Sequence, residues 1–154
     1  MDENEKRIIE TIDAQSERLI AFAQDIYTHP EAGFKEVRTA GKVAEVFREL
    51  NLPFQEGLAL TGVKARMDCP ADGKAVTVAA IGELDGIMCQ SHPDSDPETG
   101  LTHACGHNLQ LTALVGAAMA LSQPEIRSAL CGNVVFFAVP SEEFTDIDFK
   151  SKLM

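Results

Sequence analysis

Two apolar stretches and the apolar segment between them most constrain the fold of this chain. Residues 75–85 (AVTVAAIGELD) and 132–140 (GNVVFFAVP) are rich in β-branched and aromatic side chains, which is typical of fully buried strands. Residues 108–121 are apolar nearly all round, which predicts a buried helix. A buried helix between two buried strands favours a layered α/β domain.

The rest of the chain adds two helices and one strand to this prediction. Apolar residues recur with a helical period over residues 4–28 and again over residues 35–50. Residues 62–68 alternate between polar and apolar side chains, as in a strand, and residues 70–74 (PADGK) contain the Asp-Gly pair of a tight turn. We therefore expect the strands at 62–68 and 75–85 to form a β-hairpin.

The acidic composition narrows the class of partner. The 154 residues carry a formal net charge of −11, which argues against binding to nucleic acid or to an anionic membrane surface. An acidic surface can also serve solubility alone. The N-terminal residues are charged and lack the apolar core of a secretion signal, and no apolar run is as long as a membrane span. We therefore expect a single domain in the cytoplasm.

The cysteines are expected to be reduced in that compartment. The four cysteines are Cys69, Cys89, Cys105 and Cys131, and they form no CxxC pair. In a reducing compartment, free thiols or metal ligands are more common than disulfides. One alternative is a thiolate nucleophile formed by Cys105 with His103 or His107, although residues so close in sequence rarely reach the geometry that such a pair needs.

Residues 103–108 (HACGHN) form a candidate metal site. In an extended loop, Cys105 and His107 point to the same side, and the glycine between them lets the backbone bend. The helix that follows places the positive end of its dipole beside a thiolate. Thiolate and imidazole together suit Zn²⁺ and other transition metals. The alternative for Cys105 is a buried structural cysteine, and His103 is either a third ligand or part of the loop surface.

Acidic residues lie at the ends of both buried strands. Glu142 and Glu143 follow the second strand, and Glu83 and Asp85 close the first. Because open α/β sheets bind ligands at the carboxyl ends of their strands, we expect these side chains and the HACGHN loop to converge. One glutamate would bind the metal while the other takes a proton from water, and Asp85 would orient a ligand imidazole. The alternatives are a solvated glutamate pair and polar residues that only end a strand.

Five short motifs follow one another along nearly the whole chain. They are HPEAGFKEVRTA (29–40), TGVKA (61–65), GELDG (82–86), HACGHN (103–108) and PSEE (140–143). With this set the chain resembles the M20 family of metallopeptidases, and in particular the amidohydrolase branch that includes hydrolases of N-acyl amino acids, aminobenzoyl-glutamate and indole-acetyl amino acids. The combination of HACGHN with a downstream PSEE is specific.

The resemblance implies an α/β, zinc-peptidase-like catalytic domain with a central mixed sheet flanked by helices. It assigns Cys105, His107 and Glu143 as metal ligands, Glu142 as the general base, and Asp85 as a supporting catalytic residue. The implied metal is Zn²⁺ or Mn²⁺, with two ions possible in the complete enzyme. The implied reaction is hydrolysis of the amide bond in a small N-acyl amino acid or peptide-like substrate.

The chain departs from the family in length and at two positions. Family members carry further histidine ligands downstream of the double glutamate and a lid domain that often dimerises, whereas all four histidines here precede Glu143. Glu83 and Asn108 stand where many members have Asp. We therefore expect residues 1–154 to be the N-terminal part of the catalytic domain, without the lid and the C-terminal part, with little activity alone and a homodimer only in the complete protein. The alternative is a non-catalytic remnant that binds a metal or a partner.

Overall fold

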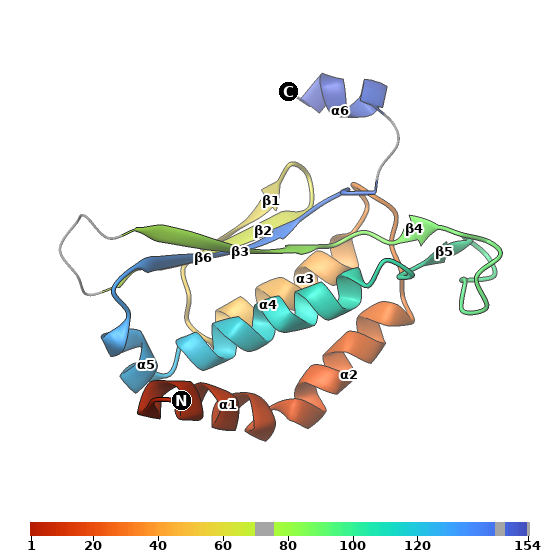
Figure 1. The fold of residues 1–154 in the computed structure, drawn as a ribbon. Helices are drawn as coiled ribbons and strands as arrows, with labels where there is room; N and C mark the ends of the chain where they lie inside the picture. Colours follow the sequence, from red (N-terminus) through yellow and green to blue (C-terminus); the bar gives the residue numbers. More distant parts are fainter. Residues whose placement is uncertain (70–75, 144–146, 154) are drawn as a thin grey trace.

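The computed structural model describes residues 1–69, 76–143 and 147–153. They form an α/β fold with a mixed sheet and accompanying helices, as the sequence predicts (Figure 1). The elements in chain order are α1 (Glu3–Ala14), α2 (Ser16–Tyr27), α3 (Val37–Glu49), β1 (Phe54–Leu58), β2 (Gly62–Met67), β3 (Thr77–Glu83), β4 (Ile87–Met88), β5 (Leu101–Thr102), α4 (His107–Leu121), α5 (Pro124–Ala129), β6 (Asn133–Val139) and α6 (Ile147–Leu153).

The main sheet has the strand order β1-β2-β6-β3, and β4 pairs with β5 in a separate two-stranded sheet. β6 runs antiparallel to β2 and parallel to β3. The hairpin expected from residues 62–68 and 75–85 is therefore wrong, because β6 lies between these two strands. The turn expected at residues 70–74 falls outside the described residues. Parallel neighbours need a crossover connection, and α4 lies in the one that joins β3 to β6.

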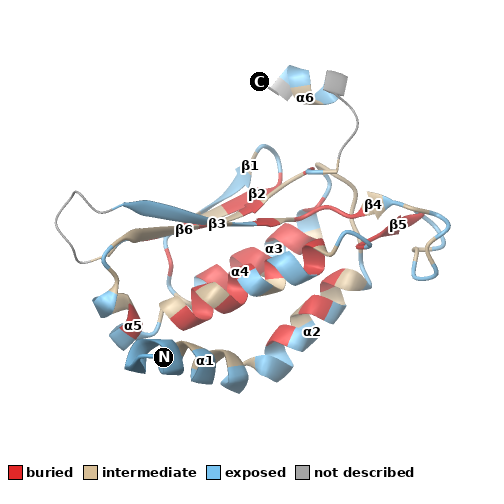
Figure 2. Ribbon diagram, in the orientation of Figure 1, coloured by how far each residue is buried: buried red, intermediate tan, exposed pale blue. Residues whose placement is uncertain are grey.

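α4 is the central helix of the core (Figure 2). It packs against β3 and β6 on one side and against α1 and α2 on the other. This position explains its uniformly apolar sequence and confirms the prediction of a buried helix. At 15 residues α4 is shorter than a membrane span. Across the described part of the chain, no helix is long and apolar enough to cross a membrane.

The helix expected over residues 4–28 is two helices. α1 and α2 meet at Gln15, where the backbone leaves the helical conformation with φ −98° and ψ 5°. The bend brings both helices onto α4: a Cβ at Gly116 would lie 3.4 Å from a methyl carbon of Ile12 in α1 and of Leu19 in α2. The apolar period continues across the bend, so the sequence pattern alone does not reveal it.

β3 is more exposed than the fully buried strand that its composition predicts. Val78 and Ile81 are 60% and 59% exposed. β3 is the edge strand of the described sheet, whereas β6 has a neighbour on each side and buries Phe136 and Ala138 completely. The two strands have similar compositions, so their different burial depends on their places in the sheet.

We expect Phe136→Ala to lower the free energy of unfolding by about 3–5 kcal/mol. Its ring is fully buried, and its centroid lies 6.2 Å from that of Phe47 on α3. Urea denaturation followed by circular dichroism measures the change. The control is Ile20→Ala at a site 57% exposed on α2, where we expect a change below about 0.5 kcal/mol. An equal loss of unfolding free energy in both variants would contradict the placement of Phe136 in the core and Ile20 on the surface.

Candidate metal centre

Three segments meet at the carboxyl ends of the strands, where β3 and β6 end and α4 begins. Since β3 and β6 are parallel and Glu83 lies opposite Val139, the two strand ends are level. The N–H of Leu84 donates to the carbonyl of Val139 at 2.9 Å and extends this pairing into the loop. α4 begins at His107, after Gly106 has turned the chain with a φ of +87°. This left-handed conformation favours glycine.

His107 lies among acidic side chains. Its Nε2 is 2.9 Å from a carboxylate oxygen of Glu83. The same nitrogen lies 3.8 Å from Glu142 and 3.9 Å from Glu143. The potential ligand atoms of Glu83, His107 and Glu142 all lie within 4.8 Å of one another. A hydrogen bond with Asp85 and the charge of Glu83 outweigh the effect of burial and raise the pKa of His107 to about 9.

Asp85 connects His107 to the glutamate pair. Its carboxylate is almost completely buried and accepts the backbone N–H groups of Glu142 and Glu143, each at 3.0 Å. Its backbone carbonyl lies 2.7 Å from Nδ1 of His107, and a carbonyl only accepts, so Nδ1 donates and Nε2 faces the carboxylates. Burial raises the pKa of Asp85, but the hydrogen bonds from His107 and the two N–H groups hold it below its usual value.

Cys105 is exposed and lies beside Glu143. The hydrogen bond with Glu143, together with burial and the nearby charges of Glu142 and Asp85, raises the pKa of the thiol to about 11. A thiol nucleophile needs the opposite environment, one that stabilises the thiolate. This environment disfavours the alternative of a thiol nucleophile. The other alternative for Cys105, a buried structural cysteine, is wrong because this side chain is exposed.

His103 is 2% exposed, so the alternative that places it on the loop surface is wrong. Burial and the nearby His107 lower its pKa to about 4. Neither ring nitrogen has a hydrogen-bond partner among the described residues. Within the same residues, the group with metal-ligand spacing is Glu83, His107 and Glu142, so it includes neither His103 nor the predicted ligands Cys105 and Glu143.

Glu83 is the residue of this centre to which the sequence assigned no role. It is the carboxylate nearest to His107, at 2.9 Å. The parallel pairing of β3 with β6 sets its position, because it places Glu83 opposite Val139, at the start of the segment that leads to Glu142. The sequence predicted that this acidic strand end converges with the HACGHN loop, but it gave Glu83 no role there.

A cavity of about 410 Å³ opens beside the acidic group. Asp85 and Glu143 lie at its wall, and apolar side chains contribute much of the remainder. The full lining is Ala32, Gly33, Asp85, Gly86, Ile87, Met88, Leu101 and Glu143. A small, partly apolar molecule could therefore lie next to the carboxylates.

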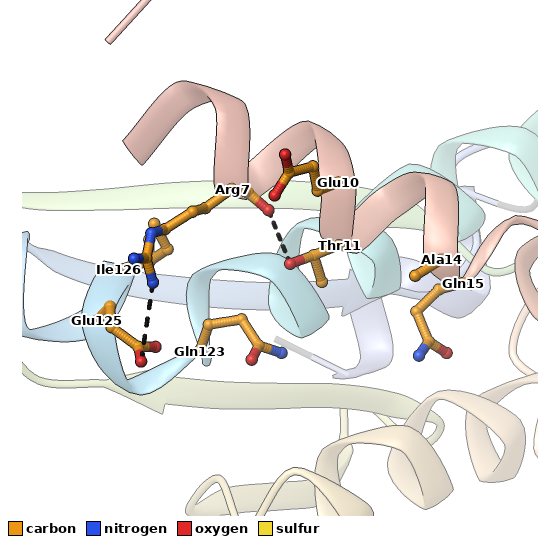
Figure 3. Close-up of a pocket in the computed structure, with 8 residues that line it drawn as sticks. All are labelled: Arg7, Glu10, Thr11, Ala14, Gln15, Gln123, Glu125 and Ile126. Carbon is orange, nitrogen blue, oxygen red and sulfur yellow. Dashed lines mark hydrogen bonds and ion pairs between the residues drawn. The ribbon is translucent and has the colours of Figure 1, made fainter. Parts of the chain in front are cut away.

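Another cavity, of about 340 Å³, lies between α1 and α5, away from the sheet edge (Figure 3). Its cation, Arg7, pairs with Glu125 at 3.8 Å. The hydroxyl of Thr11 donates to the backbone carbonyl of Arg7 at 2.8 Å. These polar groups are engaged in contacts within this surface, and the cavity is remote from the acidic group around His107.

Comparisons with known proteins show which proteins this chain is similar to. No family model matches the chain. N-acetylcysteine deacetylase of Bacillus subtilis (strain 168) is 33% identical over 130 residues, which are 82% of this chain and 33% of that protein. Thermostable carboxypeptidase 1 of Saccharolobus solfataricus is 30% identical over 129 residues, 81% of this chain and 32% of that protein. The chain thus spans about a third of the length of these relatives.

A solved structure shares the fold at a similar level of identity. The Bacillus subtilis YXEP protein, described as a dinuclear metal-binding peptidase from the M20 family, superimposes with a TM-score of 0.73 and 32% identity. The match covers 85% of this chain and 36% of that one.

In the metal-free protein, we expect Cys105 to react slowly with iodoacetamide at neutral pH. The rate should rise as the pH approaches about 11, where the thiol loses its proton. Mass spectrometry of the alkylated peptide over a pH series measures this rate. Glu143→Gln removes the neighbouring charge and should move the rise to lower pH. Rapid alkylation at neutral pH in both proteins would contradict the assigned environment.

Proposed function

Because this chain belongs to the M20 family of metallopeptidases and amidohydrolases, we propose that residues 1–154 form part of the catalytic domain of a metal-dependent amide hydrolase. The observation that carries this proposal is the grouping of Glu83, His107 and Glu142 within 4.8 Å at the carboxyl ends of β3 and β6. The proposed substrates are N-acyl amino acids or small dipeptide-like molecules. The names of the relatives, an N-acetylcysteine deacetylase and a carboxypeptidase, support this class.

The chemistry of the donor set fits a divalent cation. Several carboxylates surround a single imidazole, and partial burial makes such an excess of negative charge costly without a cation. We propose Cys105, His107 and Glu143 as ligands, with Glu83 as a further one, and Zn²⁺ or Mn²⁺ as the metal. When bound, the ion supplies Lewis acidity and makes a nearby water molecule more acidic. The surrounding carboxylates are Glu83, Asp85, Glu142 and Glu143.

Glu142 is the proposed general base. Its side chain is 49% exposed, whereas that of Glu143 is 23% exposed and contacts the thiol of Cys105. Glu142 is therefore the more accessible of the two to water and substrate. In the proposed reaction Glu142 takes a proton from the attacking water and delivers it to the leaving amine. The products are a carboxylic acid and a free amino acid or amine.

Asp85 supports this reaction without contacting the substrate's reacting atoms. Its carboxylate holds the backbone of Glu142 and Glu143, and its carbonyl holds the imidazole of His107. The apolar part of the substrate would lie in the neighbouring cavity, against Ile87 and Met88. We attribute any second metal ion and any homodimer to the whole protein, since the chain spans about a third of its relatives.

We expect the metal-free chain to bind about one Zn²⁺ or Mn²⁺ per molecule, because the acidic group is already assembled around His107. Equilibrium dialysis followed by elemental mass spectrometry measures the ratio. The double variant Cys105→Ser, His107→Ala should lose this binding. Cys131→Ser, which changes an exposed cysteine outside the centre, should keep it. Equal binding by both variants would refute the assigned ligands.

Asp85→Asn should weaken metal affinity by about 10–100-fold. An amide offers one acceptor oxygen instead of two, so the N–H of either Glu142 or Glu143 loses its acceptor. Competition with a chelator of known affinity measures the change. Asp68→Asn is the matched control, since that carboxylate is 66% exposed and lies outside the centre. An unchanged affinity in Asp85→Asn would show that this residue does not orient the ligands.

A further inference from the structure

Glu36 is a fully buried acid that the proposed reaction does not use. It directly precedes α3, and its carboxylate reaches two distant segments. One oxygen accepts the hydroxyl of Thr61, directly before β2, at 2.6 Å. The other accepts the backbone N–H of Ser141, two residues after β6, at 2.8 Å. Glu36 thus joins three motifs of the sequence, HPEAGFKEVRTA, TGVKA and PSEE.

Capping of α3 does not explain this buried carboxylate. Glu36 makes no side-chain hydrogen bond to the first turn of its own helix. That turn is capped by another acid, because Glu31 accepts the N–H of Arg38 at 3.0 Å and that of Thr39 at 2.7 Å. Burial raises the pKa of Glu36, while hydrogen bonds from Thr61 and from backbone N–H groups partly oppose the rise. A costly buried acid is therefore devoted to contacts away from its own helix.

The turn that Glu36 holds is strained and lies directly before the glutamate pair. Ser141 is buried and has a φ of +59°, which is unfavourable for a residue with a side chain. Such a conformation persists where the surroundings impose it. Glu36 binds the N–H of Ser141, and Asp85 binds those of Glu142 and Glu143. Two buried carboxylates therefore hold three consecutive backbone N–H groups.

We propose that Glu36 is a positioning residue that sets the direction of the Glu142 and Glu143 side chains through the backbone of Ser141. The inference rests on the proposed function in one respect: its test uses metal binding at the proposed centre to detect a change in the direction of those side chains. The carboxylate of Glu36 suits this position because the groups that it contacts, the N–H of Ser141 and the hydroxyl of Thr61, are both hydrogen-bond donors. A glutamine of the same shape would direct an N–H₂ group at one of them.

The test compares Glu36→Gln with Thr61→Val in the full chain, with Co²⁺ as the probe. Thr61→Val removes the side-chain hydrogen bond to the same carboxylate and leaves the bond to Ser141. We expect Glu36→Gln to change the visible Co²⁺ spectrum and to weaken Co²⁺ binding by about tenfold or more. Thr61→Val should keep the wild-type spectrum and affinity. Urea denaturation of both variants shows whether a change in affinity follows from a general loss of stability.

A wild-type spectrum and affinity in Glu36→Gln would overturn the proposal, as would equal losses in the two variants. Amide hydrogen exchange by NMR gives a second measurement on the unmutated chain, which is decisive if Glu36→Gln does not fold. The N–H of Ser141 should be strongly protected, and exchange as fast as in an exposed loop would also overturn the proposal.

The same experiment separates this inference from the proposed function. If the wild-type chain does not bind Co²⁺, the proposal that residues 1–154 bind a metal ion by themselves is refuted. Positioning by Glu36 is then judged from the amide resonances of Glu142 and Glu143, which must shift in Glu36→Gln and remain in place in Thr61→Val.

Discussion

The hydrogen bonds of Asp85 are the interaction on which the candidate centre depends. One buried carboxylate accepts the N–H groups of Glu142 and Glu143, while the carbonyl of the same residue accepts the imidazole of His107. The ends of β3 and β6 and the start of α4 are thereby joined through a single residue. Because the carboxylate is ionised and well supplied with donors, these bonds are stronger than neutral ones and favour one geometry.

The packing of α4 makes this arrangement possible. The helix lies between the sheet and the α1–α2 pair, so its first residue, His107, has little freedom to move relative to the strand ends. Glycine at position 106 lets the chain turn into the helix at that point. The parallel pairing of β3 with β6 then places Glu83 level with the segment that carries the glutamate pair. Fold and site therefore depend on the same β3–α4–β6 unit.

The electrostatics of the centre favour a bound cation over a free thiol nucleophile. The acids around His107 raise the pKa of its imidazole to about 9 and that of the Cys105 thiol to about 11. In the absence of a cation, these shifts keep protons on both groups. A divalent ion would compete with those protons, which links its binding to pH and to the carboxylates that surround it.

The sequence by itself determined the α/β class, the buried helix at 108–121 and the two acid-ended strands, because hydrophobic period and burial follow directly from residue type. It also carried the motifs on which the family resemblance rests. Only the tertiary structure decided that β6 lies between β2 and β3, that the first helix bends at Gln15, that Glu83 lies against His107, and that Glu36 binds the backbone of Ser141. Strand order and contacts between distant segments arise from long-range packing, which local propensity does not encode.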